Sequence, residues 1–130
     1  MTPATYDFDV VRGSSGAFNG LVVRLKTRDE NDNLINLQFD DVRLSIYDKA
    51  ASSATRELLI RATFENGQMQ LSDEYDAEVS WVPTAEETRT LKIGEKNHYE
   101  LEVRDGTEET VYMLGIINGI GGLNDDESAS

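Results

Sequence analysis

Apolar and polar residues alternate along most of this chain, and the alternation repeats at every second position. Successive side chains of a β-strand point to opposite faces, so the pattern predicts strands with one buried face and one face in water. The alternating runs are residues 6–10, 21–25, 42–46, 60–64, 77–81 and 99–103.

A further run, residues 111–117, is apolar at almost every position. Its even-numbered positions, among them Leu114, continue the alternation and are assigned to the buried face. Val111, Met113 and Ile117 lie between them and are apolar as well. This composition predicts a last strand that is covered on both faces.

Turn-forming residues separate the runs, at positions 13–16, 31–33, 65–67 and 105–106. Asn and Asp tolerate a left-handed backbone and Gly adopts it freely, so such residues suit tight turns. Asp105-Gly106 stands between two long alternating runs and predicts a β-hairpin. About seven strands with turns at short intervals predict an all-β, antiparallel sandwich.

One short helix is predicted over residues 84–91. Thr84 follows Pro83, and Glu87 stands three positions further on. This spacing is typical of a capping box, in which the threonine caps the helix and the glutamate reaches back to the backbone of the threonine.

The chain has 130 residues, about the size of one domain. We expect a single sandwich domain over residues 1–123 and a disordered acidic tail over residues 124–130. Cysteine is absent, which excludes disulfides, thiol chemistry and cysteine-ligated zinc.

The formal net charge is −13, which makes nucleic acid and anionic membranes poor partners. The charge favours solubility and opposes non-specific association. The first ten residues have no basic start and no apolar stretch, so they do not resemble a signal peptide. No run approaches the roughly 18 apolar residues of a membrane span.

The sequence contains no arrangement of residues typical of a catalytic site, and we predict a non-enzymatic protein without cofactor or metal. His98 is the only histidine and is expected on the solvent face of its strand, beside Glu100 and Glu102. The two glutamates share one strand face and are expected to be exposed and solvated, not opposed across a cleft as in glycosidases. Trp81, the only tryptophan, is expected in the core and not on a sugar-binding surface.

The segment 29–33 has oxygen-bearing side chains at alternate positions, which is the spacing that calcium ligands often follow. Leu34 stands where a calcium loop needs glycine, and Asp40 stands where it needs a bidentate glutamate. A polar hairpin turn is therefore the preferred interpretation, with calcium binding as the alternative.

Glycines gather near the end of the chain, at positions 115, 119, 121 and 122. They open no predicted helix and no lysine follows them, so they do not resemble a phosphate-binding loop. We interpret them as a bend, a bulge or a flexible exit from the last strand.

Four stretches of the sequence carry a resemblance to known proteins when taken in order: residues 6–18 (YDFDVVRGSSGAF), 29–48 (DENDNLINLQFDDVRLSIYD), 79–91 (VSWVPTAEETRTL) and 98–126 (HYELEVRDGTEETVYMLGIINGIGGLNDD). Together they resemble a family of small phage and prophage virion proteins. The family includes tail and baseplate proteins whose N-terminal domain is similar to that of baseplate upper proteins. The sequence departs from the expected pattern at Gly13-Ser14, where an acidic residue often follows the glycine, and in the 29–33 turn, which lacks a glycine.

The resemblance implies an immunoglobulin-like β-sandwich and a structural or assembly role in the particle, in the tail or baseplate. The implied partners are copies of the chain itself, as a homo-oligomer, and other virion proteins. The implied location is the virion, and the host cytoplasm during assembly. A small β-sandwich module that binds carbohydrate or acts with calcium is the alternative function. The candidate contact residues are the apolar ones left on second strand faces, although some could cover a second core layer: Val11, Val22, Leu59, Val111, Met113 and Ile117.

Overall fold

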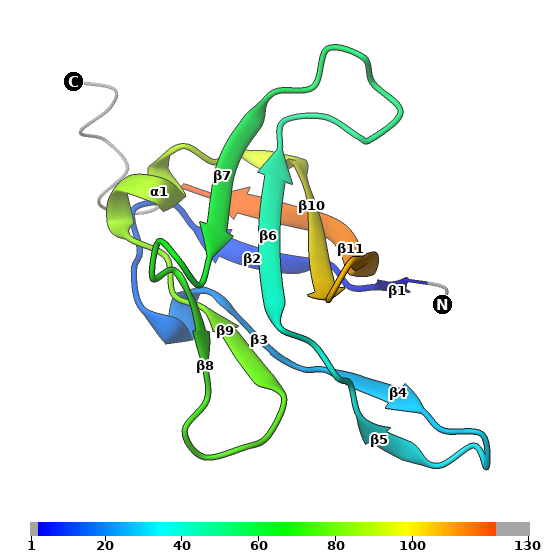
Figure 1. The fold of residues 1–130 in the computed structure, drawn as a ribbon. Coiled ribbons are helices and arrows are strands. Elements are labelled where there is room, and N and C mark those ends of the chain that lie inside the picture. Colours follow the sequence, from blue (N-terminus) through cyan, green and yellow to red (C-terminus); the bar gives the residue numbers. More distant parts are fainter. Residues whose placement is uncertain (1–2, 122–130) are drawn as a thin grey trace.

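The computed structural model describes residues 3–121, and most of them lie in strands (Figure 1). This confirms the predicted all-β class. The helical elements are a single 3-10 turn, η1 (Ala17–Asn19), and a short helix, α1 (Ala85–Arg89). The strands are β1 (Ala4–Thr5), β2 (Phe8–Val11), β3 (Leu21–Arg24), β4 (Lys26–Arg28), β5 (Leu34–Asn36), β6 (Asp41–Tyr47), β7 (Leu58–Thr63), β8 (Met69–Leu71), β9 (Glu78–Trp81), β10 (Gly94–Asp105) and β11 (Glu108–Ile120).

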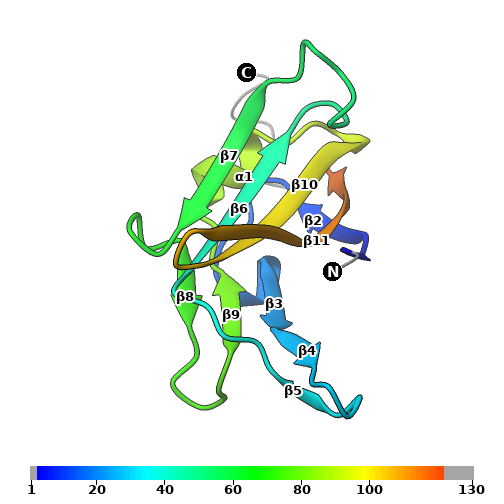
Figure 2. The same cartoon turned by 45° about the vertical axis from the view of Figure 1, so that its right-hand side comes forward.

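The strands form a large sheet, a small sheet and a separate hairpin. The large sheet has the order β1–β11–β10–β6–β7, and β2 pairs with the far end of β11. β1 and β2 run parallel to β11, and the other neighbours in this sheet are antiparallel. The small sheet has the order β3–β9–β8, and the β4–β5 hairpin extends away from both sheets (Figures 1 and 2).

The core lies between the large and the small sheet. The large sheet contributes Leu44 and Leu101, and the small sheet contributes Val79 and Trp81, all of them fully buried. Trp81 pairs with Leu21 on one side and with Met69 on the other, so it occupies the middle of the small sheet. The predicted core position of Trp81 is therefore confirmed.

The predicted hairpin at Asp105-Gly106 is confirmed, because Asp105 pairs with Glu108 across a two-residue loop. Gly106 has φ 64°, and no positive φ occurs at Thr107. A positive φ at only the first loop residue is the requirement of a type II′ turn, which glycine meets without strain.

A β-bulge in β11 reverses the predicted faces of this strand. Leu101 pairs with Met113 and Glu102 pairs with Val111, so Tyr112 is an extra residue without a partner of its own. Beyond the bulge, Met113 faces the core and Leu114 is 37% exposed. The expectation that the even-numbered positions form the buried face was wrong, because one extra residue exchanges the two faces of a strand.

The extra residue also links the two sheets. The hydroxyl of Tyr112 accepts a hydrogen bond from the backbone N–H of Lys26 at 2.8 Å and donates to its carbonyl at 3.1 Å. Lys26 begins β4 and is separated from the end of the small-sheet strand β3 by one residue. The bulge therefore places a polar aromatic side chain against the point where the chain leaves the small sheet.

The two glycines inside β11 are places of close backbone approach. A Cβ at Gly115 would lie 2.1 Å from the carbonyl oxygen of Tyr6, and one at Gly119 would lie 2.0 Å from that of Lys92. Gly115 and Gly119 lie within a paired strand, so they do not form a flexible exit from it. The pairing of Gly119 with Gly94 stands beside a register irregularity, which is compatible with the bulge that was the second interpretation. Gly122 lies outside the described residues. The predicted tail, residues 124–130, lies outside the described residues.

The predicted helix is present and shorter than expected. Thr84 accepts a hydrogen bond from the N–H of Glu87 at 3.1 Å, and Glu87 accepts one from the N–H of Thr84 at 3.0 Å. The predicted capping box is therefore confirmed.

Replacing Thr84 by alanine should lower the free energy of unfolding by about 1 kcal/mol, because loss of the hydroxyl leaves the backbone N–H of Glu87 without its acceptor. Urea unfolding followed by circular dichroism measures this loss. Thr90→Ala is the comparison, since Thr90 lies at the other end of the helix and should cost less. Equal losses for the two variants would contradict the role of the capping box.

Candidate interaction surface

The large sheet has an outer face that points away from the core. The register aligns its side chains in three rows across β6, β10 and β11. We call these nine residues the outer face: Arg43, Glu102 and Val111 in the first row, Ser45, Glu100 and Leu114 in the second, and Tyr47, His98 and Ile116 in the third.

Ion pairs hold the charged residues of the outer face. Arg43 donates to Glu102 at 2.9 Å, and Arg56 donates to Glu100 at 3.2 Å while its guanidinium lies 3.8 Å from the centre of the Tyr47 ring. The hydrogen bond to Glu102 raises the pKa of Arg43. The two glutamates were expected to be exposed and solvated, but they are half-buried and paired with arginine.

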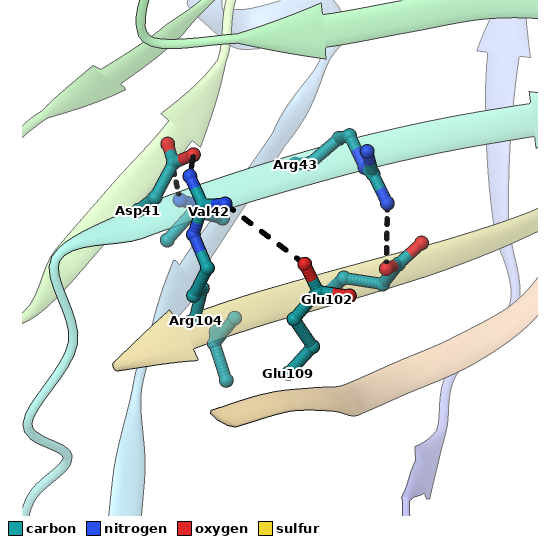
Figure 3. A pocket seen from close by; sticks show the side chains of 7 residues that line it. Asp41, Val42, Arg43, Glu102, Arg104 and Glu109 are labelled. Atoms are coloured by element: carbon teal, nitrogen blue, oxygen red, sulfur yellow. Dashed lines mark hydrogen bonds and ion pairs between the residues drawn. The ribbon is translucent and has the colours of Figure 1, made fainter. Parts of the chain in front are cut away.

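The first row ends in a small charged pocket near the β10–β11 turn (Figure 3). Arg104 donates to Asp41 at 2.9 Å and lies 3.9 Å from a carboxylate oxygen of Glu109. The pocket has a volume of about 50 Å³, close to the space of one or two water molecules. It is too small for an organic ligand, and its arginines and carboxylates pair with one another (Figure 3).

His98 lies on the predicted strand face and is half-buried there. It lines a shallow pocket together with Tyr47, Arg56, Glu100 and Leu114. The residues around it are aromatic, aliphatic and ion-paired, an environment that suits a packing role on the surface of the sheet.

The β11 side of the outer face is apolar. Val111 and Ile116 are half-buried, and Leu114 between them is exposed. The aliphatic side chains of β11 thus lie beside the ion-paired glutamates of β10. Such a surface can be covered by another protein without leaving a charge unpaired, which would be costly.

The six candidate contact residues lie in different environments. Val11 and Val22 are exposed, at 41% and 53%, at the end of β2 and on the small sheet. Val111 lies half-buried on the outer face, and Leu59 is half-buried against the core. Met113 and Ile117 are buried in the core, at 7% and 0% exposure, and are not available for contacts. For these two residues the alternative of a covered core layer therefore applies, because the bulge at position 112 turns them inward.

The sequence pattern did not single out two strongly exposed apolar residues. Phe18 in η1 is completely exposed, and Leu34 in β5 is 60% exposed. Phe18 stands between Gly16 and Gly20 without an alternating neighbour. An aromatic residue in a glycine-rich turn, outside any alternating run, was the feature of the sequence that could have indicated an exposed side chain at Phe18. Both side chains lie where a partner protein could cover them.

The segment 29–33 forms the turn of the β4–β5 hairpin, as preferred from the sequence. Asp29 Oδ1 accepts hydrogen bonds from the N–H groups of Asn31 and Asn33, both at 2.9 Å. Asp32 has φ 64° and pairs with Arg28 at 3.7 Å. One carboxylate oxygen of Asp29 and one of Asp32 are therefore engaged within the turn. Among residues 3–121, no group of three or more His, Asp or Glu side chains is placed to hold a metal ion.

Within the part of the chain that the structure describes, no helix is long and apolar enough to cross a membrane. The sequence was also compared with known proteins. No protein-family model matches the chain, and no curated protein matches it.

Proposed function

We propose that this chain is a non-enzymatic structural or assembly protein of a phage or prophage particle, associated with the tail or baseplate. It would work by burying its surface against copies of itself and against neighbouring virion proteins. The four ordered stretches of the sequence that resemble such proteins motivate the proposal. The outer face described above is the single structural observation that supports it best.

The arrangement of the strands supports an immunoglobulin-like sandwich. In such folds the strands C, F and G lie together in one sheet and B, E and D lie in the other. Here β6, β10 and β11 lie together in the large sheet, and β3, β9 and β8 form the small one. Taken in chain order, β3, β6, β8, β9, β10 and β11 correspond to strands B to G, and β7 corresponds to an added strand beside C.

The outer face supports a role in protein contacts. Its aliphatic residues Val111, Leu114 and Ile116 lie beside Glu100 and Glu102, whose charges are already paired. Burial of this face would gain apolar contact without desolvating an unpaired ion. The net charge of −13 would keep subunits soluble before they assemble.

Mass spectrometry of particles purified from a strain that carries this gene tests the proposal. The chain should be present in stoichiometric amounts. Leu114→Arg should weaken its incorporation at least tenfold, since a central apolar contact is worth more than about 1.4 kcal/mol. Leu71→Arg is the matched control, because Leu71 is an exposed leucine of the small sheet, on β8.

Circular dichroism should show that both variants fold as the unchanged chain does. Complete absence of the chain from purified particles would refute the virion role. Equal incorporation of the two variants would instead refute the outer face as the contact surface.

A further inference from the structure

The large sheet ends at β7, which among the described strands pairs only with β6 (Figure 2). β7 is six residues long, and Arg61 is its one charged residue. The free edge of such a strand can pair with a strand of another molecule. Proteins prevent this pairing with charged side chains, with very short edge strands or with a group that covers the edge. We therefore expect the edge of β7 to be protected in one of these ways.

The other described strand edges are protected by charge or by their length. β1 and β2 cover part of β11, and the end of β11 that they leave uncovered begins with Glu108 and Glu109. Two copies of this acidic edge repel each other, in a chain whose net charge is −13. The outer strands of the small sheet and the strands of the β4–β5 hairpin have only three or four residues. Neither form of protection applies to β7.

The side chain of Asn66, in the turn after β7, covers the edge of this strand. In an antiparallel pair, every second residue directs its N–H and C=O away from the partner strand. Arg61 and Thr63 do so in β7. The side-chain amide of Asn66 donates to the C=O of Arg61 at 2.9 Å, and its carbonyl oxygen accepts from the N–H of Thr63 at 3.0 Å. A neighbouring strand would offer the same edge one donor and one acceptor.

Further hydrogen bonds fix Asn66 in this position. Its side-chain oxygen also accepts from the N–H of Gln68 at 3.1 Å. Its backbone N–H donates to the hydroxyl of Thr63 at 3.0 Å. The turn therefore holds the amide against the edge, and a strand that arrives there has to displace it.

We propose that Asn66 is an autoinhibitory contact, which occupies the edge of β7 and prevents β7 of a second copy from extending the large sheet. A second copy is the partner to be excluded, because it carries the same edge and β7 has no acidic residue that would repel its counterpart. The contact is independent of the outer face and of the function proposed above. With the edge of β7 closed, copies that associate have to use another surface.

Replacing Asn66 by alanine opens the edge and tests the proposal. The association constant between copies should rise about tenfold, since each copy gains one backbone donor and one acceptor for pairing. Light scattering over a concentration series measures this constant. Hydrogen exchange at the Thr63 amide should slow as the protein concentration rises. The reference chain and all variants carry Leu114→Arg, so that association through the outer face does not contribute.

A second substitution on β7 tests whether the association uses this edge. Proline at position 61 removes an N–H that faces the free edge, and proline is tolerated on edge strands for that reason. Asn66→Ala/Arg61→Pro should therefore associate no more than the reference chain, with circular dichroism to verify the fold. Asn31→Ala is the matched control. Asn31 is exposed in the turn of the β4–β5 hairpin, and its side chain makes no hydrogen bond to the described residues.

Equal association constants for Asn66→Ala and the reference chain would overturn the proposal. Association of Asn66→Ala that persists after Arg61→Pro would overturn it too, because the contact would then lie elsewhere. Exchange at Thr63 in Asn66→Ala that does not slow with concentration would have the same meaning, even if Arg61→Pro failed to fold.

Discussion

Replacing Trp81 by alanine is expected to lower the free energy of unfolding by about 3–5 kcal/mol. The side chain is completely buried between Leu21 and Met69 of the neighbouring strands. Its truncation leaves a cavity at the centre of the small sheet, where the facing large sheet cannot easily close in. Urea unfolding followed by circular dichroism measures the loss.

Two further variants separate packing from polarity at this position. Among the described residues, the indole Nε1 of Trp81 has no hydrogen-bond partner. Trp81→Phe should therefore cost clearly less than Trp81→Ala, since it removes volume and breaks no hydrogen bond. Val22→Ala on the exposed side of the same sheet should stay within about 0.5 kcal/mol of the unchanged chain. A loss below about 1 kcal/mol for Trp81→Ala would contradict the central place of this residue.

Replacing Asn97 by leucine is expected to lower the free energy of unfolding by about 2–4 kcal/mol. The buried amide of Asn97 satisfies both backbone groups of Lys92 and also donates to the carbonyl of Ile117 at 3.0 Å. Leucine has a similar size, so the loss would come from backbone groups left without partners. Urea unfolding gives the magnitude, and hydrogen exchange at the Lys92 amide should become faster.

Asn118 provides the control for Asn97. It stands on the neighbouring strand and makes one exposed hydrogen bond, to Asp9 at 3.3 Å. Asn118→Leu should change the stability by no more than about 0.5 kcal/mol. Unchanged exchange at Lys92 in Asn97→Leu would mean that the loop before β10 holds its shape by other contacts.

The alternation of apolar and polar residues predicted the strands well where each strand pairs regularly. Tyr99, Leu101 and Val103 of β10 face the core as expected. The hairpin at Gly106 follows from its local turn chemistry. These features depend on neighbouring residues in the chain, which the sequence shows directly. The capping box of α1 was predictable for the same reason.

The faces of β11 could not be predicted in this way. The run around Tyr112 is apolar at odd and even positions alike, so alternation could not tell which face of the strand is buried. The bulge that decides it depends on how β11 pairs with Leu101 and Glu102 of β10. Register between strands is a property of the pair, and one extra residue exchanges every later side chain.

The outer face was only partly accessible from the sequence for a related reason. Glu100 and Glu102 share one strand face in the sequence pattern, but Leu114 joins them only because of how β11 pairs with β10. The role of Asn97 depends on a loop that returns to it, and asparagine in a polar stretch gives no sign of burial. Both features depend on contacts that no local sequence pattern shows.

The parallel pairing of β1 and β2 with β11 has a consequence for synthesis on the ribosome. Ala4 pairs with Met113 and Val11 pairs with Ile120. The first strands to be synthesised therefore have no pairing partner until the last strand has been made. Until β11 emerges, β10 also lacks its hairpin partner, and the large sheet cannot be completed. Contacts of such long sequence separation slow folding. Each newly made chain therefore passes through a period in which several strand edges are open to pairing with other nascent chains.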